Sequence, residues 1–129
     1  MRSLTLDTGA LIALERGEKR MHVISKAARL AETVMIAPAP VITQWWRGSQ
    51  RSGRHSPREI LKTIHVEPVD ARLAKIAGEA IAATPSTKDA VDAIVMASAA
   101  QRGDIVYTSD LGDLELLRHY FPDVRVLRA

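Results

Sequence analysis

The chain opens with Leu4-Thr5-Leu6-Asp7-Thr8-Gly9-Ala10-Leu11-Ile12-Ala13-Leu14, which predicts a short strand followed at once by a helix. Residues 4–6 form the strand, and Gly9 permits a tight turn into a helix over residues 10–15. The same order, an apolar run of strand type and then a helical segment, recurs to the end of the chain.

Four more strands are expected, at residues 34–36, 64–66, 105–107 and 124–127. Helices are expected over residues 21–32, from Pro40 onward, and over 57–62, 70–82, 89–101 and 111–120. Strands that alternate with helices predict an α/β domain of three layers, in which helices flank a mostly parallel central sheet. Ligand sites in such sheets lie beyond the carboxyl ends of the strands, where the strand order reverses.

Local signals refine three of the helices. Helical spacing places Val23, Ala27, Leu30 and Ala31 on one apolar side of the helix over residues 21–32. Asp70 is expected to cap the helix that follows it. Ser86 and Asp89 have the spacing of a capping box, which makes Asp89 the partner of Ser86.

Length and composition restrict the class of protein. The 129 residues are expected to form a single domain over residues 1–129, because one core typically organises about 100–150 residues. Cysteine is absent, which excludes disulfides and thiolate metal ligands. No apolar run reaches the roughly 18 residues that a membrane span requires, so a cytoplasmic protein with no membrane association is expected.

Four aspartates lie where an α/β sheet places its ligands. Asp7 follows the first strand directly, and Asp110 follows the fourth after a Thr-Ser step. Asp92 lies early in a helix that is apolar nearly all round, where a carboxylate is costly unless it is paired or bound to metal. Asp113 follows Asp110 by one helical turn and can join the same cluster.

Carboxylate ligands without a histidine or cysteine partner suit Mg²⁺ or Mn²⁺. The four histidines are scattered and show no ligand spacing. At a phosphodiester, carboxylate-held cations activate water and stabilise charge on the attacked and leaving oxygens. The pattern therefore predicts a site for divalent metal.

Each acid also has an ordinary structural interpretation. Asp7 and Asp110 can simply cap the helices that follow them, Asp113 can be a solvated surface residue, and Asp92 can pair with an arginine. Asp89 is interpreted as a capping residue and left outside the metal site. The conjunction of four acids, more than any one of them, favours the metal site.

Three blocks resemble motifs of the PIN-domain family. Residues 4–14 resemble its opening strand and turn, residues 89–97 its central acidic helix, and residues 107–114 its last acidic motif. The blocks stand in family order and span essentially the whole chain. The resemblance implies a parallel sheet flanked by helices and a metal-dependent endoribonuclease with Asp7, Asp92, Asp110 and Asp113 at the metal.

The length is similar to that of VapC-type ribonuclease toxins. That resemblance implies RNA as the substrate, a homodimer, and a cognate antitoxin of a type II toxin–antitoxin pair. One position departs from the family pattern, because Gln44 stands where the family usually has glutamate. Glutamine keeps the size but loses the charge, so metal affinity and orientation of the attacking water should suffer at this catalytic position. Two explanations of Gln44 stay open. The residue is natural to a weakened or non-catalytic member of the family, or it is an isosteric substitution that permits production of a toxic nuclease.

A basic run begins just after Gln44 in a chain of net charge +3, and it consists of Arg47, Arg51, Arg54, Arg58 and Lys62. Arg47, Arg51 and Arg54 are candidates for contacts with RNA phosphates, which position a substrate without specifying its sequence. A solvated polar face is the alternative interpretation. Trp45 and Trp46 cannot share one helix face, so one is expected in the core and the other partly exposed.

Two other functions compete with the nuclease. Phosphoryl transfer on an aspartate, as in haloacid-dehalogenase-like phosphatases, normally needs an Asp-x-Asp opening, whereas Thr8 and Gly9 follow Asp7 here. A non-catalytic PIN fold that binds RNA or a partner protein is supported by Gln44 and opposed by the intact set of four aspartates. The sequence therefore favours an Mg²⁺- or Mn²⁺-dependent endoribonuclease.

Overall fold

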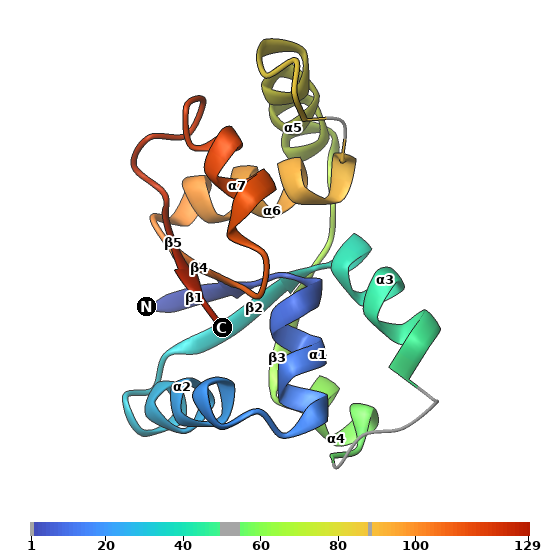
Figure 1. Cartoon of the computed structure of the whole chain (residues 1–129), viewed down its shortest axis with the longest axis vertical. Coiled ribbons are helices and arrows are strands. Elements are labelled where there is room, and N and C mark those ends of the chain that lie inside the picture. Colours follow the sequence, from blue (N-terminus) through green and yellow to red (C-terminus); the bar gives the residue numbers. More distant parts are fainter. Residues whose placement is uncertain (1, 50–54, 88) are drawn as a thin grey trace.

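A computed structural model describes residues 2–49, 55–87 and 89–129 of the chain, and its centre is a five-stranded sheet (Figure 1). The strands are β1 (Ser3–Leu6), β2 (Val34–Pro38), β3 (Ile64–Glu67), β4 (Ile105–Thr108) and β5 (Arg125–Arg128). They lie in the order β3-β2-β1-β4-β5, and all neighbouring pairs run parallel. The predicted α/β class is confirmed.

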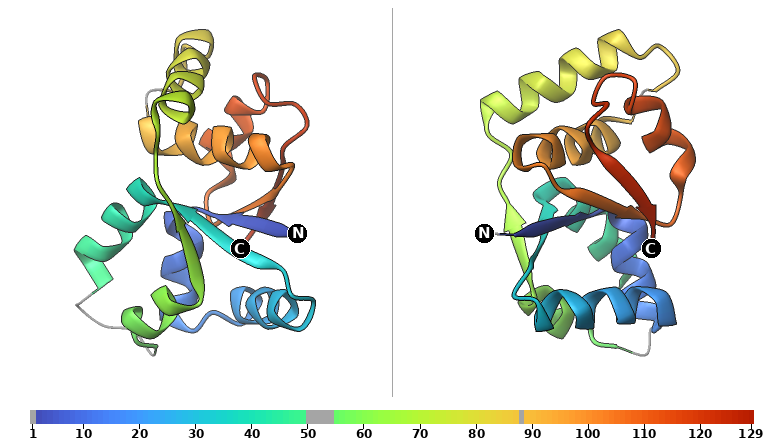
Figure 2. Two further views of the ribbon diagram at one scale, coloured as in Figure 1. Left: turned by 180° about the vertical axis from the view of Figure 1, so that it is seen from behind. Right: turned by 90° about the vertical axis from the view of Figure 1, so that its left-hand side faces the viewer.

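Helices form the connections between the strands. They are α1 (Thr8–Arg16), α2 (Lys19–Leu30), α3 (Ala39–Ser49), α4 (Pro57–Lys62), α5 (Ala71–Ala83), α6 (Ala90–Arg102) and α7 (Leu111–Leu117). Helices α1, α2 and α4 lie on one side of the sheet, and α6 and α7 lie on the other (Figures 1 and 2). Helix α5 packs on α6 and forms an outer layer there.

The strand order reverses at β1. The chain first builds outward from β1 through β2 to β3, then crosses back through α5 and α6 to place β4 on the other side of β1. Neighbouring connections that leave in opposite directions mark the region beyond the carboxyl ends of β1 and β4, called the crevice below, as the place where such sheets bind ligands. That crevice is where the sequence places Asp7 and Asp110.

Helix α6 is the centre of the core. Six of its residues are fully buried, namely Ala93, Val95, Met96, Ala97, Ser98 and Ala99. The run of alanines lets α6 contact both the sheet and α5 closely, which explains why a helix this apolar is stable here. Trp45 is also buried and Trp46 is half-buried, as their adjacency predicts.

The apolar side predicted for α2 faces outward. Val23 is 59% exposed and Leu30 is 78% exposed, whereas Met21 and Ala28 are buried. Both sides of α2 carry apolar residues at helical spacing, so periodicity alone could not select the side that packs. Among the described residues, every helix falls short of the length and hydrophobicity that a transmembrane span requires.

Helix caps follow the sequence with one correction. Asp70 caps α5 as predicted, since its carboxylate accepts from the Leu73 backbone N–H at 2.8 Å. Asp89 is itself the N-cap of α6 and accepts from the backbone N–H groups of Val91 and Asp92. The capping-box interpretation of Asp89 was wrong because α6 begins at Ala90, so Asp89 precedes the helix and cannot occupy its third position.

A polar network around Arg102 ties the end of α6 to the sheet. Its guanidinium pairs with Glu67 at the end of β3 and with Asp104 just before β4. It also donates to the hydroxyls of Thr5 and Ser98, at 2.9 and 2.8 Å. The Asp104 side chain is only 3% exposed, so Arg102 neutralises a charge that water cannot reach.

Replacing Arg102 with methionine should therefore lower the free energy of unfolding by about 3 kcal/mol or more, because two acids lose their cation. Urea denaturation measures this loss. The matched control is Lys62→Met, whose partner Glu59 is 71% exposed, and it should change the free energy by less than about 0.5 kcal/mol. Equal losses in the two variants would contradict this role of Arg102.

Candidate functional site

The crevice beyond β1 and β4 brings together the four aspartates that the sequence singles out. Asp7 follows β1 directly and caps α1, and its Oδ1 accepts from the Ala10 backbone N–H at 2.9 Å. Asp110 follows β4 after Ser109 and caps α7 through the Gly112 backbone N–H at 3.0 Å. Asp92 and Asp113 lie in the first turns of α6 and α7.

Asp7 and Asp110 thus each cap a helix and also lie close to the other aspartates. Each cap engages one oxygen of the carboxylate and holds the side chain at the crevice. Capping alone does not require burial, yet Asp7 is only 8% exposed. The burial of Asp7 among other acids therefore needs a further reason.

Gly9 permits the close approach of the two halves of the site. A Cβ at Gly9 would lie 1.9 Å from the Ser109 Oγ and 3.2 Å from the Ser109 backbone nitrogen. Gly9 has an ordinary negative φ, so space rather than conformational freedom requires a glycine here. The start of α1 and the loop after β4 can pack together only because this position lacks a side chain.

Burial and mutual repulsion together set the electrostatics of the crevice. They raise the pKa of Asp92 to about 7: burial has the largest effect, followed by the charges of Asp89, Asp7, Asp113 and Asp110 in that order. Burial also raises the pKa of Asp7, although hydrogen bonds from Thr108 and two backbone N–H groups oppose that change. Asp89, which the sequence interpretation left outside the site, is the acid whose charge acts most strongly on Asp92.

Basic partners do not relieve this repulsion within residues 2–49, 55–87 and 89–129. All ion pairs found there involve other acids, namely Glu59, Glu67, Asp104 and Glu115. In the same ranges, no three acidic or histidine side chains lie close enough to hold one ion jointly. Hard oxygen donors with unbalanced charge nevertheless fit Mg²⁺ or Mn²⁺ chemically, because a cation would supply the missing counter-charge. The assignment of these residues as metal ligands stays a prediction.

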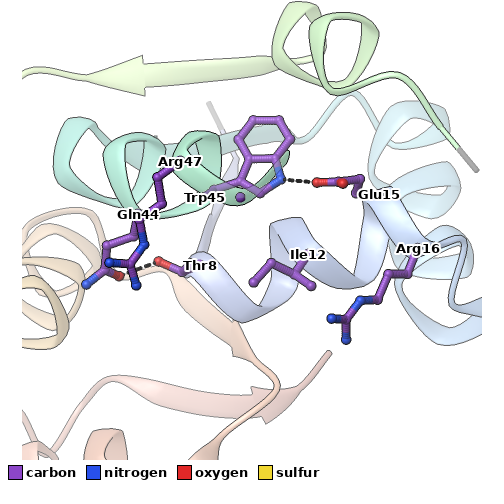
Figure 3. A pocket seen from close by; sticks show the side chains of 8 residues that line it. Thr8, Ile12, Glu15, Arg16, Gln44, Trp45 and Arg47 are labelled. Atoms are coloured by element: carbon purple, nitrogen blue, oxygen red, sulfur yellow. Dashed lines mark hydrogen bonds between the residues drawn. The ribbon is translucent and has the colours of Figure 1, made fainter. Parts of the chain in front are cut away.

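Gln44 lies on α3 beside the acids and is held by Thr8. The Thr8 hydroxyl donates to the Gln44 Oε1 at 2.7 Å (Figure 3). Since this bond engages the amide oxygen, Gln44 presents its N–H donors to the surroundings. A glutamate could accept the same bond and keep a second oxygen for a cation. The sequence revealed the missing charge of Gln44, but the contact with Thr8 required the structure.

The predicted basic run divides between two helices. Arg47 is exposed on α3, one turn beyond Gln44, and Arg58 is exposed on α4. Arg51 and Arg54 lie outside the described residues. Of the three predicted RNA contacts, Arg47 alone is among the described residues.

A cavity of about 430 Å³ lies between α1 and α3 next to Gln44 (Figure 3). Thr8, Ile12 and Glu15 line it from α1, and Trp45 and Arg47 line it from α3, with Arg16 at its edge. The Trp45 indole N–H donates to the Glu15 Oε1 at 2.8 Å. The sequence analysis missed Glu15 and Arg16, and the signal available was a charged pair at the end of an otherwise apolar helix.

Known proteins share this fold and its motifs. A family model for the PIN domain matches residues 4–118. No curated protein matches the chain by sequence. Among solved structures, the chain is similar to VapBC2 from Rickettsia felis bound to a promoter DNA fragment, with 12% identity, a TM-score of 0.75 and 98% of both chains covered.

Two further structures show the same architecture. DNA-bound VapBC from Salmonella typhimurium has 17% identity and a TM-score of 0.73, with 99% of this chain and 98% of that chain covered. VapC20 from Mycobacterium tuberculosis, a toxin that cleaves the sarcin–ricin loop, has 22% identity and a TM-score of 0.65, with 87% and 92% covered. At these identities the similarity concerns the fold.

The raised pKa of Asp92 makes stability depend on pH in a defined direction. The folded chain keeps a proton on Asp92 up to about pH 7, whereas the unfolded chain releases it near the ordinary value of 3.8. Stability without metal should therefore fall as pH rises from about 4 to 7, since the folded state binds more protons in that window. Asp92→Asn removes this dependence, so in EDTA its melting temperature should rise above that of the unaltered protein by a few degrees as the pH approaches 7.5.

Thermal denaturation at several pH values checks this expectation, with the exposed loop residue Asp123 changed to asparagine as the control. Asp123→Asn should follow the unaltered protein throughout. An offset of Asp92→Asn that stays constant between pH 4 and 7.5 would refute the raised pKa of Asp92.

Proposed function

The chain belongs to the PIN-domain family, and from that membership we propose that it is a metal-dependent endoribonuclease, the toxin of a type II toxin–antitoxin pair. One observation carries the proposal: aspartates from distant parts of the sequence meet in the crevice beyond β1 and β4, where no described basic residue pairs with them. A scaffold without a ligand gains nothing from this arrangement, because each added acid makes the charged form of Asp92 less favourable.

In this proposal Asp7, Asp92, Asp110 and Asp113 hold Mg²⁺ or Mn²⁺. When bound, the cation supplies positive charge that favours attack of water on a phosphodiester and stabilises the leaving oxygen. The caps made by Asp7 and Asp110 fix their carboxylates on two helix starts and reduce the cost of ordering them. The hydrogen bonds to Asp7 favour its charged form, which a cation requires, and partly oppose the rise in its pKa that burial causes.

Gln44 attenuates the proposed activity. Its Oε1 already accepts from Thr8 and carries no negative charge, so the side chain is a weaker ligand for a cation than a carboxylate and cannot accept a proton from water. Its amide N–H groups can still donate to a phosphate oxygen. The result is a site that binds RNA with a weakened catalytic step.

Partners follow from the same family membership. Several structural relatives are complexes of VapBC or FitAB type, which supports a cognate antitoxin as a partner of this chain. VapC20 cleaves the sarcin–ricin loop, which supports RNA as the substrate class. A homodimer that acts in the cytoplasm completes the proposal, with exposed Arg47 and the neighbouring Arg51 and Arg54 as RNA contacts.

A second function is favoured by Gln44 alone. If the engaged amide removes catalysis entirely, the protein is a PIN-fold module that binds RNA or a partner without cleaving it. The two functions share the fold and differ in turnover.

Cleavage of a mixed RNA pool in Mg²⁺ or Mn²⁺ tests the proposal. The unaltered protein should cut slowly, and Gln44→Glu should cut at least about tenfold faster, because the carboxylate keeps the Thr8 hydrogen bond and adds a charged oxygen. Asp92→Asn, combined with Gln44→Glu, should return cleavage to background. EDTA should abolish it in every variant.

Failure of Gln44→Glu to cut, in a protein that remains folded and still binds RNA, would favour the non-catalytic module. Cleavage that persists after Asp92→Asn would place the active site elsewhere.

A further inference from the structure

The cavity between α1 and α3 contains a buried acid that the metal site does not use. We propose that this cavity binds one unpaired nucleotide beside the scissile phosphate, and that Glu15 selects a base with adjacent N–H donors, guanine above all. The inference rests on the proposed ribonuclease function and adds a base preference to it.

Glu15 is the reason to expect a ligand. It is only 6% exposed, and Trp45 is the one hydrogen-bond donor to its carboxylate among the described residues, through Oε1. A second donor would offset more of the desolvation of this carboxylate. Since Glu15 lines the cavity, a donor on a bound molecule can reach it there.

The bond from Trp45 also fixes the direction of the acid. Trp45 is 1% exposed, so its indole cannot move away without opening the core. Its N–H therefore holds the Glu15 carboxylate in one orientation, as Figure 3 shows. A rigid acceptor discriminates between ligands better than a mobile one, because it cannot adjust to a wrong pattern of donors.

The chemistry of a fixed carboxylate favours guanine. The Watson–Crick edge of guanine presents two neighbouring N–H donors, which a carboxylate can accept together. Adenine and cytosine present one amino group beside a ring acceptor. Uracil presents two carbonyl oxygens around a single N–H, and these oxygens would be repelled by Glu15.

The size and the remaining walls suit a nucleotide. The volume of about 430 Å³ lies within the range of about 300–1,000 Å³ that is typical of small-ligand sites. Ile12 offers an apolar surface to a base. Arg16 and Arg47 are exposed and lie on opposite sides of Ile12 (Figure 3), where they can contact the phosphates on either side of the nucleotide.

The cavity also adjoins the acidic crevice. Thr8 and Gln44 line one end of it, and Thr8 is the residue after Asp7. A nucleotide held against Glu15 therefore places a neighbouring phosphodiester next to the aspartates. The two arginines outnumber the one acid in the cavity, which favours a polyanion over a basic peptide.

Binding of short labelled RNAs in EDTA tests the proposal without cleavage. Two heptanucleotides would be compared by fluorescence anisotropy, one with a guanosine between two runs of three adenosines and one with a uridine in the same place. The unaltered protein should bind the guanosine strand about tenfold more tightly or better. Glu15→Gln keeps an oxygen for Trp45 but loses the charge, and it should reduce this ratio to about threefold or less.

Matched variants separate the two parts of the site. Arg16→Ala with Arg47→Ala should weaken binding of both strands alike and reduce its salt dependence. The control is Arg20→Ala on α2, an exposed arginine that does not line the cavity, and it should leave the base preference unchanged. Ile12→Trp fills the cavity from its wall and should also abolish the base preference. This variant provides the test if Glu15→Gln does not fold.

Equal binding of the two strands by the unaltered protein would overturn the base preference, as would a preference that survives both Glu15→Gln and Ile12→Trp. Metal-dependent cleavage without any base preference would leave the proposed function standing and remove only this inference. Loss of both cleavage and RNA binding would instead contradict the proposed function. Binding of a lysine- or arginine-rich peptide to Glu15, with no binding of either RNA strand, would overturn the inference and assign the cavity to a protein partner.

Discussion

Repulsion among aspartates is the constraint around which the crevice is built. Burial and four neighbouring acids raise the pKa of Asp92 to about 7, so the folded chain without a cation keeps a proton where a carboxylate would normally be charged. Proteins tolerate such unfavourable arrangements at sites where the free energy of ligand binding offsets the loss of stability. The surrounding structure holds the acids in place by other means: caps at Asp7 and Asp110, the close packing of Gly9 on Ser109, and a buried α6 that cannot rotate away.

The aspartates of the crevice are distinct from the polar network around Arg102 that stabilises the fold. The reversal of strand order at β1 opens the crevice at one end of the sheet. Arg102 ties α6 to Glu67 and Asp104 with its charges paired. The chain thus pairs its acids with Arg102 in the structural network, whereas no described basic residue pairs with the aspartates around Asp92.

Much of this could be predicted from the sequence because it depends on local order. The five strands, the buried α6 and the position of Asp7 and Asp110 after parallel strands all follow from patterns of neighbouring residues. The outward side of α2 could not be predicted, since apolar residues occur on both of its sides and only tertiary packing selects Met21 and Ala28. The bonds from Thr8 to Gln44 and from Trp45 to Glu15 join residues 36 and 30 positions apart, so no local pattern announces them.

Binding of Mn²⁺ tests the central claim most directly, because it does not depend on turnover, on the RNA substrate or on the effect of Gln44 upon catalysis. Electron paramagnetic resonance of Mn²⁺ titrated into the protein at pH 7.5 counts bound and free ions. The unaltered protein and Asp123→Asn should bind Mn²⁺ saturably and equally, and Asp92→Asn should bind it at least about tenfold more weakly. Equal affinity of the unaltered protein and Asp92→Asn, or no binding by either, would contradict a metal site built from these aspartates.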